Sequence, residues 1–426
     1  MRLAHPPAPS YYLLGDSWTP RTGLRGEVTA DVAVLGGGIA GCAAALHLAK
    51  RGYRVVLLEA RTIGFGASGR SGGQTIFGLA VGQPKLEREV GREDAHRLFE
   101  LSIEALDLTQ SLIREHAIDC DYRSNHLHLA VKPRHMRELE QWNRELHDEY
   151  GYAPARLVNR AELQDHVRSD RYLGGLFDPR SGHLQPLKYT QGLARAAETA
   201  GVVIHENSEV LRYDDGAEVR VRTAQGTVRC AHLVLCGNAY IGAVAPALAR
   251  RILGVGTYII ATEPLGEERA RGLLPSNAAV ADVNWILDYF RRSRDHRLLF
   301  GGRVSYSSVQ PPRLADSMRK RMVRVFPSLA DVKVAKAWGG YLDITMSRAP
   351  DFGRLAPNVY YLQGFSGHGV ALAGLAGKLA SEAIAGTAER FDVFARIPHR
   401  DFPGGPLFRR PSLMLAMLYY RLRDLM

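Results

Sequence analysis

The stretch DVAVLGGGIAGCAAALHLAKRGYRVVLLE, residues 31–59, decides the fold. A short apolar run is followed by glycines, a helical segment, a second apolar run and an acid, which predicts strand, turn, helix and strand. The glycines form G-x-G-x-x-G at Gly36, Gly38 and Gly41. The first permits a sharp turn, the second lets a pyrophosphate approach the backbone, and the third lets the helix pack closely on the sheet. The stretch therefore predicts a dinucleotide-binding unit, with the phosphates at a helix N-terminus.

Glu59 closes the second apolar run and can accept both hydrogens of an adenosine ribose diol. An acid at this position, rather than an arginine, argues against a 2′-phosphorylated dinucleotide. Glycine makes up 43 of the 426 residues, so three spaced glycines alone are a weak signal, and an ordinary glycine turn is the competing interpretation. The strand before them, the helix after them and the acid favour the dinucleotide site.

Length and composition describe a globular protein of about two domains. The four cysteines show no C-x-x-C pair or metal-ligand spacing, so we expect no metal and a reducing, cytoplasmic setting, with Cys42 and Cys236 as small core residues. Residues 1–18 lack an apolar signal core, and no run is long enough to span a bilayer. The net charge of +11 is best explained by a solvated arginine surface. Attraction to an anionic small molecule, a membrane or nucleic acid is the less favoured explanation. No nucleic-acid motif is present, and we expect no such partner.

Two further glycine-rich segments stand out. ARTIGFGASGRSGGQTIFG, residues 60–78, predicts a long loop whose backbone can lie against a flat ligand. NVYYLQGFSGHGVALAGLAGKLASEAIAG, residues 358–386, predicts a strand, a glycine loop and a small-residue helix that packs closely under a cofactor. The N–H groups at the start of that helix would stabilise negative charge on a reduced flavin ring. His368, at this start, is equally well explained as a loop or core histidine.

The remaining pattern predicts helices and strands of a second region. Helical periodicity covers residues 95–117, 134–150 and 187–200, and a strand is expected at 126–132. Further strands are expected at 202–213, 232–240, 256–263 and 297–304, with a hairpin turn near 224–226.

The motifs at 36–41, 66–74 and 364–370, together with Glu59, resemble the D-amino-acid oxidase/glycine oxidase/sarcosine oxidase superfamily of FAD amine oxidases. The likeness covers nearly the whole chain. SYY at 10–12, the segment 288–303 and the tail 407–426 are similar to the bacterial gamma-glutamylputrescine oxidase group, which also contains L-pipecolate oxidase-like members.

The resemblance implies an α/β fold with a discontinuous, Rossmann-like FAD-binding domain built from residues 1–85, 185–240 and 335–395. Residues 86–184 and 241–334 would form a substrate domain of mostly antiparallel sheet plus helices, and 396–426 an amphipathic C-terminal tail.

The resemblance also implies the cofactor site. Gly36 to Gly41 would hold the pyrophosphate, Glu59 the ribose, the Val210 backbone the adenine, Ala67 to Gln74 the isoalloxazine, and Gly364 to Val370 its N1/O2 edge. The expected cofactor residues are Gly36, Gly38, Ile39, Ala40, Gly41, Glu59, Ala60, Arg61, Ala67, Ser68, Arg70, Ser71, Gly72, Gly73, Gln74, Val210, Gly237, Gly364, Ser366, Gly367, His368, Gly369 and Val370. Arg70 either orients a phosphate or flavin oxygen or faces solvent. The segment 338–353 lacks the cysteine that some sarcosine oxidases attach to flavin, so we expect non-covalent FAD.

Two departures from the family bear on the substrate. Ala371 stands where sarcosine oxidases place a lysine, and Leu342 stands where glycine oxidases place an arginine. A buried carboxylate without a charged or well-bonded partner costs on the order of several kcal/mol. An amine whose reacting carbon bears no carboxylate is therefore the better fit. Asp343 or Asp288 would then meet an ammonium group, although a surface acid is the commoner role for either.

Three functions follow. The first is hydride transfer from gamma-glutamylputrescine or a similar N-acylated diamine to FAD, with hydrolysis of the imine to a carbonyl. The second is oxidation of an L-pipecolate-like imino acid, which would need a cation such as Arg291 or Arg303. The third is a flavin-binding electron-transfer or regulatory partner, because cofactor motifs alone show binding only.

The candidate catalytic residues are His368, Tyr258, Tyr289, Gln74 and Arg291. Tyr258 and Tyr289 are expected to face the flavin, with Trp285 and Arg303 as further pocket residues, while each aromatic is equally explained as a core residue. The electron acceptor is O2 or a quinone or other carrier. The tail 407–426 is too short to cross a membrane. Its sequence is basic and apolar, and we favour packing on the protein body or on a second subunit over peripheral contact with an anionic membrane. The number of subunits stays open.

Overall fold

The glycine-rich stretch folds as predicted, into β2 (Val32–Leu35), α1 (Ile39–Lys50) and β3 (Val55–Leu58). The structure is a computed structural model, and it describes residues 8–305 and 312–405. The side chains of β2 and β3 are buried almost throughout, as expected for parallel strands that are covered on both faces.

These strands belong to a six-stranded sheet with the order β18-β19-β12-β2-β3-β8, in which only the β18–β19 pair is antiparallel. Strands that are far apart in the sequence thus meet in one sheet, as the discontinuous pattern predicts. The other members are β8 (Val203–His205), β12 (His232–Leu235), β18 (Asp351–Ala356) and β19 (Val359–Gln363).

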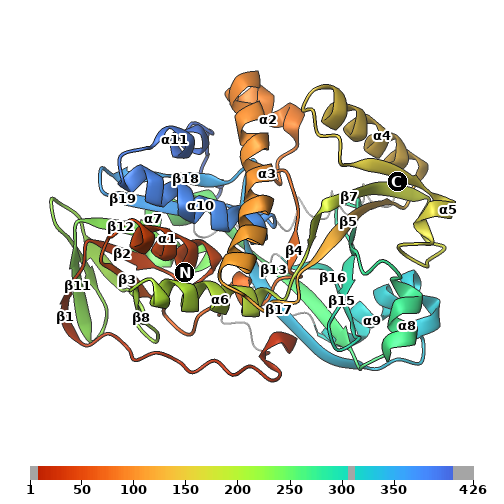
Figure 1. The fold of residues 1–426 in the computed structure, drawn as a ribbon, viewed down its shortest axis with the longest axis horizontal. Helices are drawn as coiled ribbons and strands as arrows, with labels where there is room; N and C mark the ends of the chain where they lie inside the picture. Colours follow the sequence, from red (N-terminus) through yellow and green to blue (C-terminus); the bar gives the residue numbers. More distant parts are fainter. Residues whose placement is uncertain (1–7, 306–311, 406–426) are drawn as a thin grey trace.

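Three helices, α1, α6 (Pro186–Thr199) and α10 (Gly369–Ile384), pack together beside this sheet, and α3 (Arg92–Glu115) packs on α10 (Figure 1). The small residues of α10 allow a close approach, since a Cβ at Gly377 would lie 2.5 Å from the backbone nitrogen of Ala44 in α1. A four-stranded sheet, with the order β1-β11-β10-β9, shares a second apolar cluster with the six-stranded sheet. Its strands are β1 (Gly26–Thr29), β9 (Arg212–Asp214), β10 (Val219–Arg222) and β11 (Gly226–Cys230).

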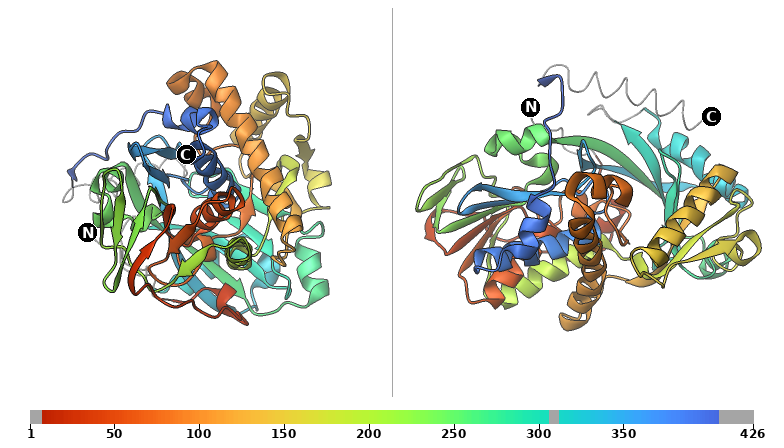
Figure 2. Two further views of the ribbon diagram at one scale, coloured as in Figure 1. Left: turned by 60° about the vertical axis from the view of Figure 1, so that its left-hand side comes forward. Right: turned by 90° about the horizontal axis from the view of Figure 1, so that it is seen from above.

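A nine-stranded, mostly antiparallel sheet has the order β17-β13-β16-β15-β14-β5-β7-β4, with β6 paired to β7. Helix α3 stands between the parallel sheet and the β5–β7 end of this large sheet (Figures 1 and 2). The strands are β4 (Gln74–Thr75), β5 (Arg123–Ala130), β6 (Arg156–Asn159), β7 (Gly174–His183), β13 (Ile252–Thr262), β14 (Ala279–Asp282), β15 (Tyr289–Arg292), β16 (Leu298–Ser305) and β17 (Val334–Thr345).

One face of the large sheet shares an apolar core with α5, α8 and α9. The opposite face is turned toward the glycine loop at 60–78, because Tyr289 on that face lies against Gly72. The remaining helices are α2 (Gln83–Val90), α4 (Pro133–Asp148), α5 (Arg160–Leu163), α7 (Pro246–Arg251), α8 (Glu267–Leu273), α9 (Leu314–Val325) and α11 (Glu389–Ala395).

The predicted helices and most predicted strands are confirmed, but the single strand expected at 202–213 is wrong. The chain forms β8 and then β9, in two different sheets. Between them, Asn207 has a positive φ of 51° and the buried Glu206 carboxylate accepts the N–H of Ile63 (2.5 Å), so the chain turns. The loop at 60–78 also contains a short 3-10 turn at Ala67–Gly69 and ends in β4.

The division into two domains stays a prediction. Strand β4 and all but the first residue of β17 lie within the ranges assigned to the FAD-binding domain, yet these two strands form the two ends of the large sheet. Among the described residues, no helix has both the length and the apolar character needed to cross a bilayer. The basic segment at 407–426 lies outside the described residues.

Candidate cofactor and active site

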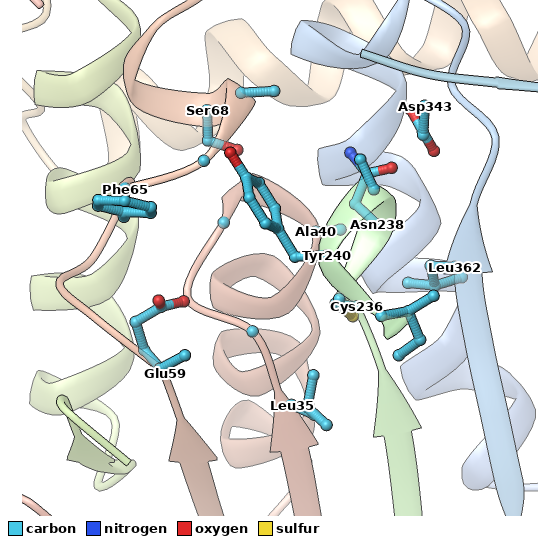
Figure 3. Close-up of a pocket in the computed structure, with 18 of the residues that line it drawn as sticks. Leu35, Ala40, Glu59, Phe65, Ser68, Cys236, Asn238, Tyr240, Asp343 and Leu362 are labelled. Atoms are coloured by element: carbon cyan, nitrogen blue, oxygen red, sulfur yellow. The ribbon is translucent and has the colours of Figure 1, made fainter. Parts of the chain in front are cut away.

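A cavity of about 340 Å³ lies at the carboxyl ends of the parallel strands β2, β3, β12 and β19 (Figure 3). Residues at or next to the ends of these strands, Leu35, Leu58, Cys236 and Leu362, line it. Open parallel sheets bind ligands at this edge. Figure 3 shows Glu59 and Asp343 on opposite sides of the cavity, and the contacts of these two residues distinguish its two ends.

The glycine motif brings α1 close to the turn after β2. A Cβ at Gly41 would lie 1.9 Å from the carbonyl oxygen of Gly36, so only glycine fits at position 41. Gly36 has a φ of 108°, and a Cβ there would lie 2.6 Å from the Cys236 carbonyl oxygen. Ser68 Oγ accepts the N–H of Ile39 (3.1 Å), which docks the second glycine loop on the N-terminus of α1.

Glu59 lies at the first end of the cavity, where its two carboxylate oxygens accept the N–H groups of Gly37 (2.7 Å) and Arg61 (2.8 Å). Desolvation raises the pKa of this carboxyl. Each carboxylate oxygen can accept a second hydrogen bond, so both remain able to accept a ribose hydroxyl. Val210 lines the cavity as well.

Asp343 lies at the second end, fully buried, and its Oδ2 accepts the N–H groups of Gly364 and Phe365. Burial raises the pKa of Asp343 to about 7. Asp343 is therefore not a surface acid, and the expectation of that commoner role is wrong. It is also wrong for Asp288, which is buried and accepts Arg321 Nε at 2.7 Å.

The N-terminus of α10 opens at this second end. Gly367, Gly369 and Val370 line the cavity, and no side chain caps the helix start at His368. The cavity thus offers a ribose acceptor at one end, two glycine-bounded helix N-termini, and largely apolar strand ends between them. This donor and acceptor set fits FAD.

The structure separates the expected cofactor residues into two sets. Those that line the cavity are Gly36, Gly38, Ile39, Ala40, Glu59, Ala60, Arg61, Ala67, Ser68, Ser71, Val210, Gly237, Gly367, Gly369 and Val370. Those outside the lining are Gly41, Arg70, Gly72, Gly73, Gln74, Gly364, Ser366 and His368.

Arg70 neither faces solvent nor reaches the cavity. Its guanidinium donates to the carbonyl oxygens of Phe65 (3.0 Å), Ala8 (2.9 Å) and Gly339 (3.2 Å). Ser366 is likewise used within the protein, because its Oγ donates to the Gly364 carbonyl oxygen (3.1 Å). Both residues stabilise the loops around the cavity.

The two tyrosines expected to face the flavin point to opposite sides of the large sheet. Tyr289 lies over the glycine loop, since a Cβ at Gly72 would lie 2.7 Å from its ring. Tyr258 packs instead in the core on the other face. Side chains alternate along a strand, and Ile259 packs with Trp338 on the loop side, so Tyr258 must point away from it.

Arg291 is buried, with each group of its guanidinium engaged. Nε donates to the Gly72 carbonyl oxygen (2.6 Å), one terminal nitrogen donates to Tyr12 Oη (3.1 Å), and the other donates to the Arg292 carbonyl oxygen. Tyr12 in turn donates to the Ser71 carbonyl oxygen (2.8 Å). Arg291 thus stabilises the glycine loop, and binding an imino acid carboxylate would cost these bonds. The side chain of Arg303 lies outside the described ones.

Sequence reasoning missed two groups of residues. The ring of Tyr240 lines the cavity and packs near Phe65 and Tyr341, and its signal was the glycine loop after the buried strand at 232–240. His126 and His128 lie beside Gln74, and their signal was two histidines on one face of a strand. Among the described residues, no group of His, Cys, Asp and Glu could hold a metal ion.

Comparisons with known proteins show which family and which fold the chain resembles. A family model described as FAD dependent oxidoreductase (DAO) matches residues 31–383. The chain is 40% identical over 417 residues to gamma-glutamylputrescine oxidoreductase of Escherichia coli, covering 97% of this chain and 98% of the relative. It is 41% identical over 400 residues to a probable oxidoreductase, OrdL, of Haemophilus influenzae, covering 93% and 92%. Its fold is similar to that of glycine oxidase from Bacillus cereus, with a TM-score of 0.71, 20% identity, and coverage of 87% and 99%.

Proposed function

The chain belongs to the family of FAD dependent oxidoreductases, and we propose that it oxidises an amine, most specifically gamma-glutamylputrescine or a similar N-acylated diamine. The observation that carries the proposal is the charge of the cavity at its α10 end. Asp343 is the acidic lining residue there, whereas the basic lining residue, Arg61, lies beside Glu59 at the other end. Leu342, which lines the cavity next to Asp343, offers no charge for an α-carboxylate.

FAD, when bound, supplies the acceptor for the hydride. The chain contributes binding, orientation and charge compensation. The open N–H groups and the dipole of α10 stabilise negative charge at the cavity end, and Asp343 holds the loop 364–366 that leads into this helix. Tyr289 and Leu187 pack against the glycine loop and exclude water from that side.

The substrate is tested by anaerobic mixing of the yellow protein with gamma-glutamylputrescine, putrescine, L-pipecolate, sarcosine and glycine. We expect gamma-glutamylputrescine to bleach the flavin fastest and the two amino acids to leave it oxidised. Bleaching by L-pipecolate alone would replace the proposed substrate, and no bleaching by any amine would favour an electron-transfer or regulatory partner. Adding oxygen and assaying peroxide distinguishes O2 from another acceptor. We also propose non-covalent FAD, so acid precipitation should leave the colour in the supernatant.

Arg348 offers a cation for the remote carboxylate of a gamma-glutamyl group. Its guanidinium lies 5.1 Å from the ring centroid of Trp285, a residue that is 44% exposed. After burial and His128, the charge of Arg348 also lowers the pKa of His368. None of the ion pairs found among the described residues involves Arg348. We expect Arg348→Gln to raise the KM for gamma-glutamylputrescine about three- to tenfold, the size of effect expected for one charge at the edge of a binding site. The KM for putrescine should not change, because putrescine has no carboxylate.

A matched control is Arg294→Gln, which removes the same charge from a surface pair with Asp119 and Asp121. Equal effects of the two variants, or equal effects of Arg348→Gln on both substrates, would contradict a specific role of Arg348. Steady-state kinetics at two ionic strengths provides the measurement, because long-range attraction weakens with salt.

A further inference from the structure

Two histidines of β5 face the side of the large sheet that holds the glycine loop. His126 and His128 alternate with Leu127 and Leu129, which belong to the core on the opposite face. His128 pairs with Ala281, which pairs in turn with Tyr289. Because directly paired residues of a sheet share a face, both imidazoles lie on the face of Tyr289, which covers Gly72.

The two imidazoles form a cluster with His368 at the start of α10. The ring centroids of His126 and His128 are 4.5 Å apart. Besides burial, which is the main cause, repulsion from His128 and His368 lowers the pKa of His126, and repulsion from His128 lowers the pKa of His368, so His368 lies near both rings. Gly367 and Gly369, on either side of His368, line the cofactor cavity. The cluster thus adjoins the end of the cavity at which the reacting amine is proposed to bind.

The hydrogen bonds of Gln74 define the tautomer of His126. Gln74 Nε2 donates to the carbonyl oxygen of Val280 (2.9 Å), which leaves Gln74 Oε1 facing His126 Nε2 at 3.2 Å. An amide oxygen can only accept, so Nε2 of His126 carries the hydrogen. The lone pair is therefore on Nδ1. This assignment follows from the partners of the ring, as tautomer assignments in proteins do.

The Nδ1 atom of His126 is buried and has no hydrogen-bond partner, and the same is true of the Nδ1 atom of His368. His126 itself is fully buried. Burial keeps both rings neutral at neutral pH, because it lowers the pKa of His126 well below its ordinary value and that of His368 to about 4. A buried acceptor without a partner is rare in folded proteins, and the one on His126 indicates a place where a donor binds.

We propose that His126, held in one tautomer by Gln74, binds the amino group of the substrate through Nδ1, with the unpaired ring nitrogen of His368 as a second contact. Gln74 is then a positioning residue that acts through His126. This inference rests on the proposed amine oxidation and adds the residues that recognise the N–H donors of the substrate.

The test compares variants of His126 in the holoenzyme by steady-state kinetics with gamma-glutamylputrescine. His126→Leu removes the acceptor, and we expect the KM to rise about tenfold or more, as for loss of a hydrogen bond to a charged donor. His126→Asn places an oxygen near the position of Nδ1 and should keep the KM within about threefold of wild type. FAD affinity and the Tm are measured for each variant and should stay unchanged.

The role of Gln74 has its own pair of variants. Gln74→Leu leaves the tautomer free and should raise the KM. Gln74→Glu, below the pKa of the new carboxyl, can donate its proton to the Val280 carbonyl oxygen and still accept from Nε2, so it should restore the KM at low pH. The matched control is His47→Leu, at a half-buried histidine of low pKa whose buried Nε2 lacks a partner but which lies by Lys50 and Lys378. This control should not change the KM.

An unchanged KM in His126→Leu, or equal changes in His126→Leu and His47→Leu, would overturn the proposed role of His126. The proposed function would remain intact in that case, provided that the amine reduces the wild type. A wild type that no amine reduces removes the proposed function and this amine site with it. If His126→Leu does not fold, the contrast between Gln74→Leu and Gln74→Glu decides, and equal KM values for those two variants overturn the proposal.

Discussion

Replacing Gly41 by alanine is expected to yield a protein that does not retain FAD. The added Cβ would lie 1.9 Å from the Gly36 carbonyl oxygen, and neither backbone can give way without moving α1 from β2. Overpacking against backbone costs on the order of 3 kcal/mol or more. Because the same turn holds the pyrophosphate site, we expect FAD affinity to fall by about a hundredfold or more. Flavin absorbance after gel filtration and the Tm measure the two effects.

The control for this prediction is Gly374→Ala, in the middle of α10. There a Cβ would find its nearest neighbour, Tyr189 Oη, at 3.7 Å, which is ordinary contact. Alanine favours a helix over glycine by about 1 kcal/mol, so this variant should be as stable as wild type or more so, and yellow. A yellow, stable Gly41→Ala protein would contradict the close approach of α1 to the turn.

Replacing Asp343 by asparagine is expected to change how the stability of the apoprotein depends on pH. Burial raises the pKa of Asp343 from 3.8 to about 7. The contribution of this carboxyl to stability is therefore fully present below about pH 4 and is lost as the pH rises through about 7. By linkage, the loss amounts to about 4 kcal/mol as an upper estimate.

Asparagine keeps an oxygen that can accept the N–H groups of Gly364 and Phe365 but carries no charge. Asp343→Asn should therefore gain stability over wild type at pH 8 and not at pH 4, as measured by urea unfolding. Asp343→Ala leaves both N–H groups without this acceptor and should lose stability at every pH, together with FAD affinity. A constant difference between the asparagine variant and wild type across this range would contradict the raised pKa.

The local parts of the cofactor site could be predicted because their spacing is contiguous. Gly36, Gly38, Gly41 and Glu59 occupy one strand-turn-helix-strand unit, and the backbone geometry of that unit places them. The second helix start, at Gly367–Val370, was predicted on the same basis. That these units belong to one fold was predicted from the family resemblance, and the comparisons confirm the family.

The face on which a side chain of the large sheet lies could not be predicted. Residues 256–263 are apolar on both sides of the strand, so their pattern does not distinguish Tyr258 from Ile259. Burial of acids and arginines was likewise hidden, because Asp343, Asp288 and Arg291 obtain their partners from distant segments. The histidines of β5 became neighbours of Gln74 only through the pairing of β4 and β5 with β7.

The walls of the cavity come from residues near 35–71, 208–211, 236–244 and 342–373. A chain emerging from the ribosome therefore cannot close this cavity until its last wall, the start of α10, has been made. Until then α1 lacks the helix against which it packs so closely through Gly377. Cofactor capture must be a late event of synthesis, after all six strands of the parallel sheet have been made.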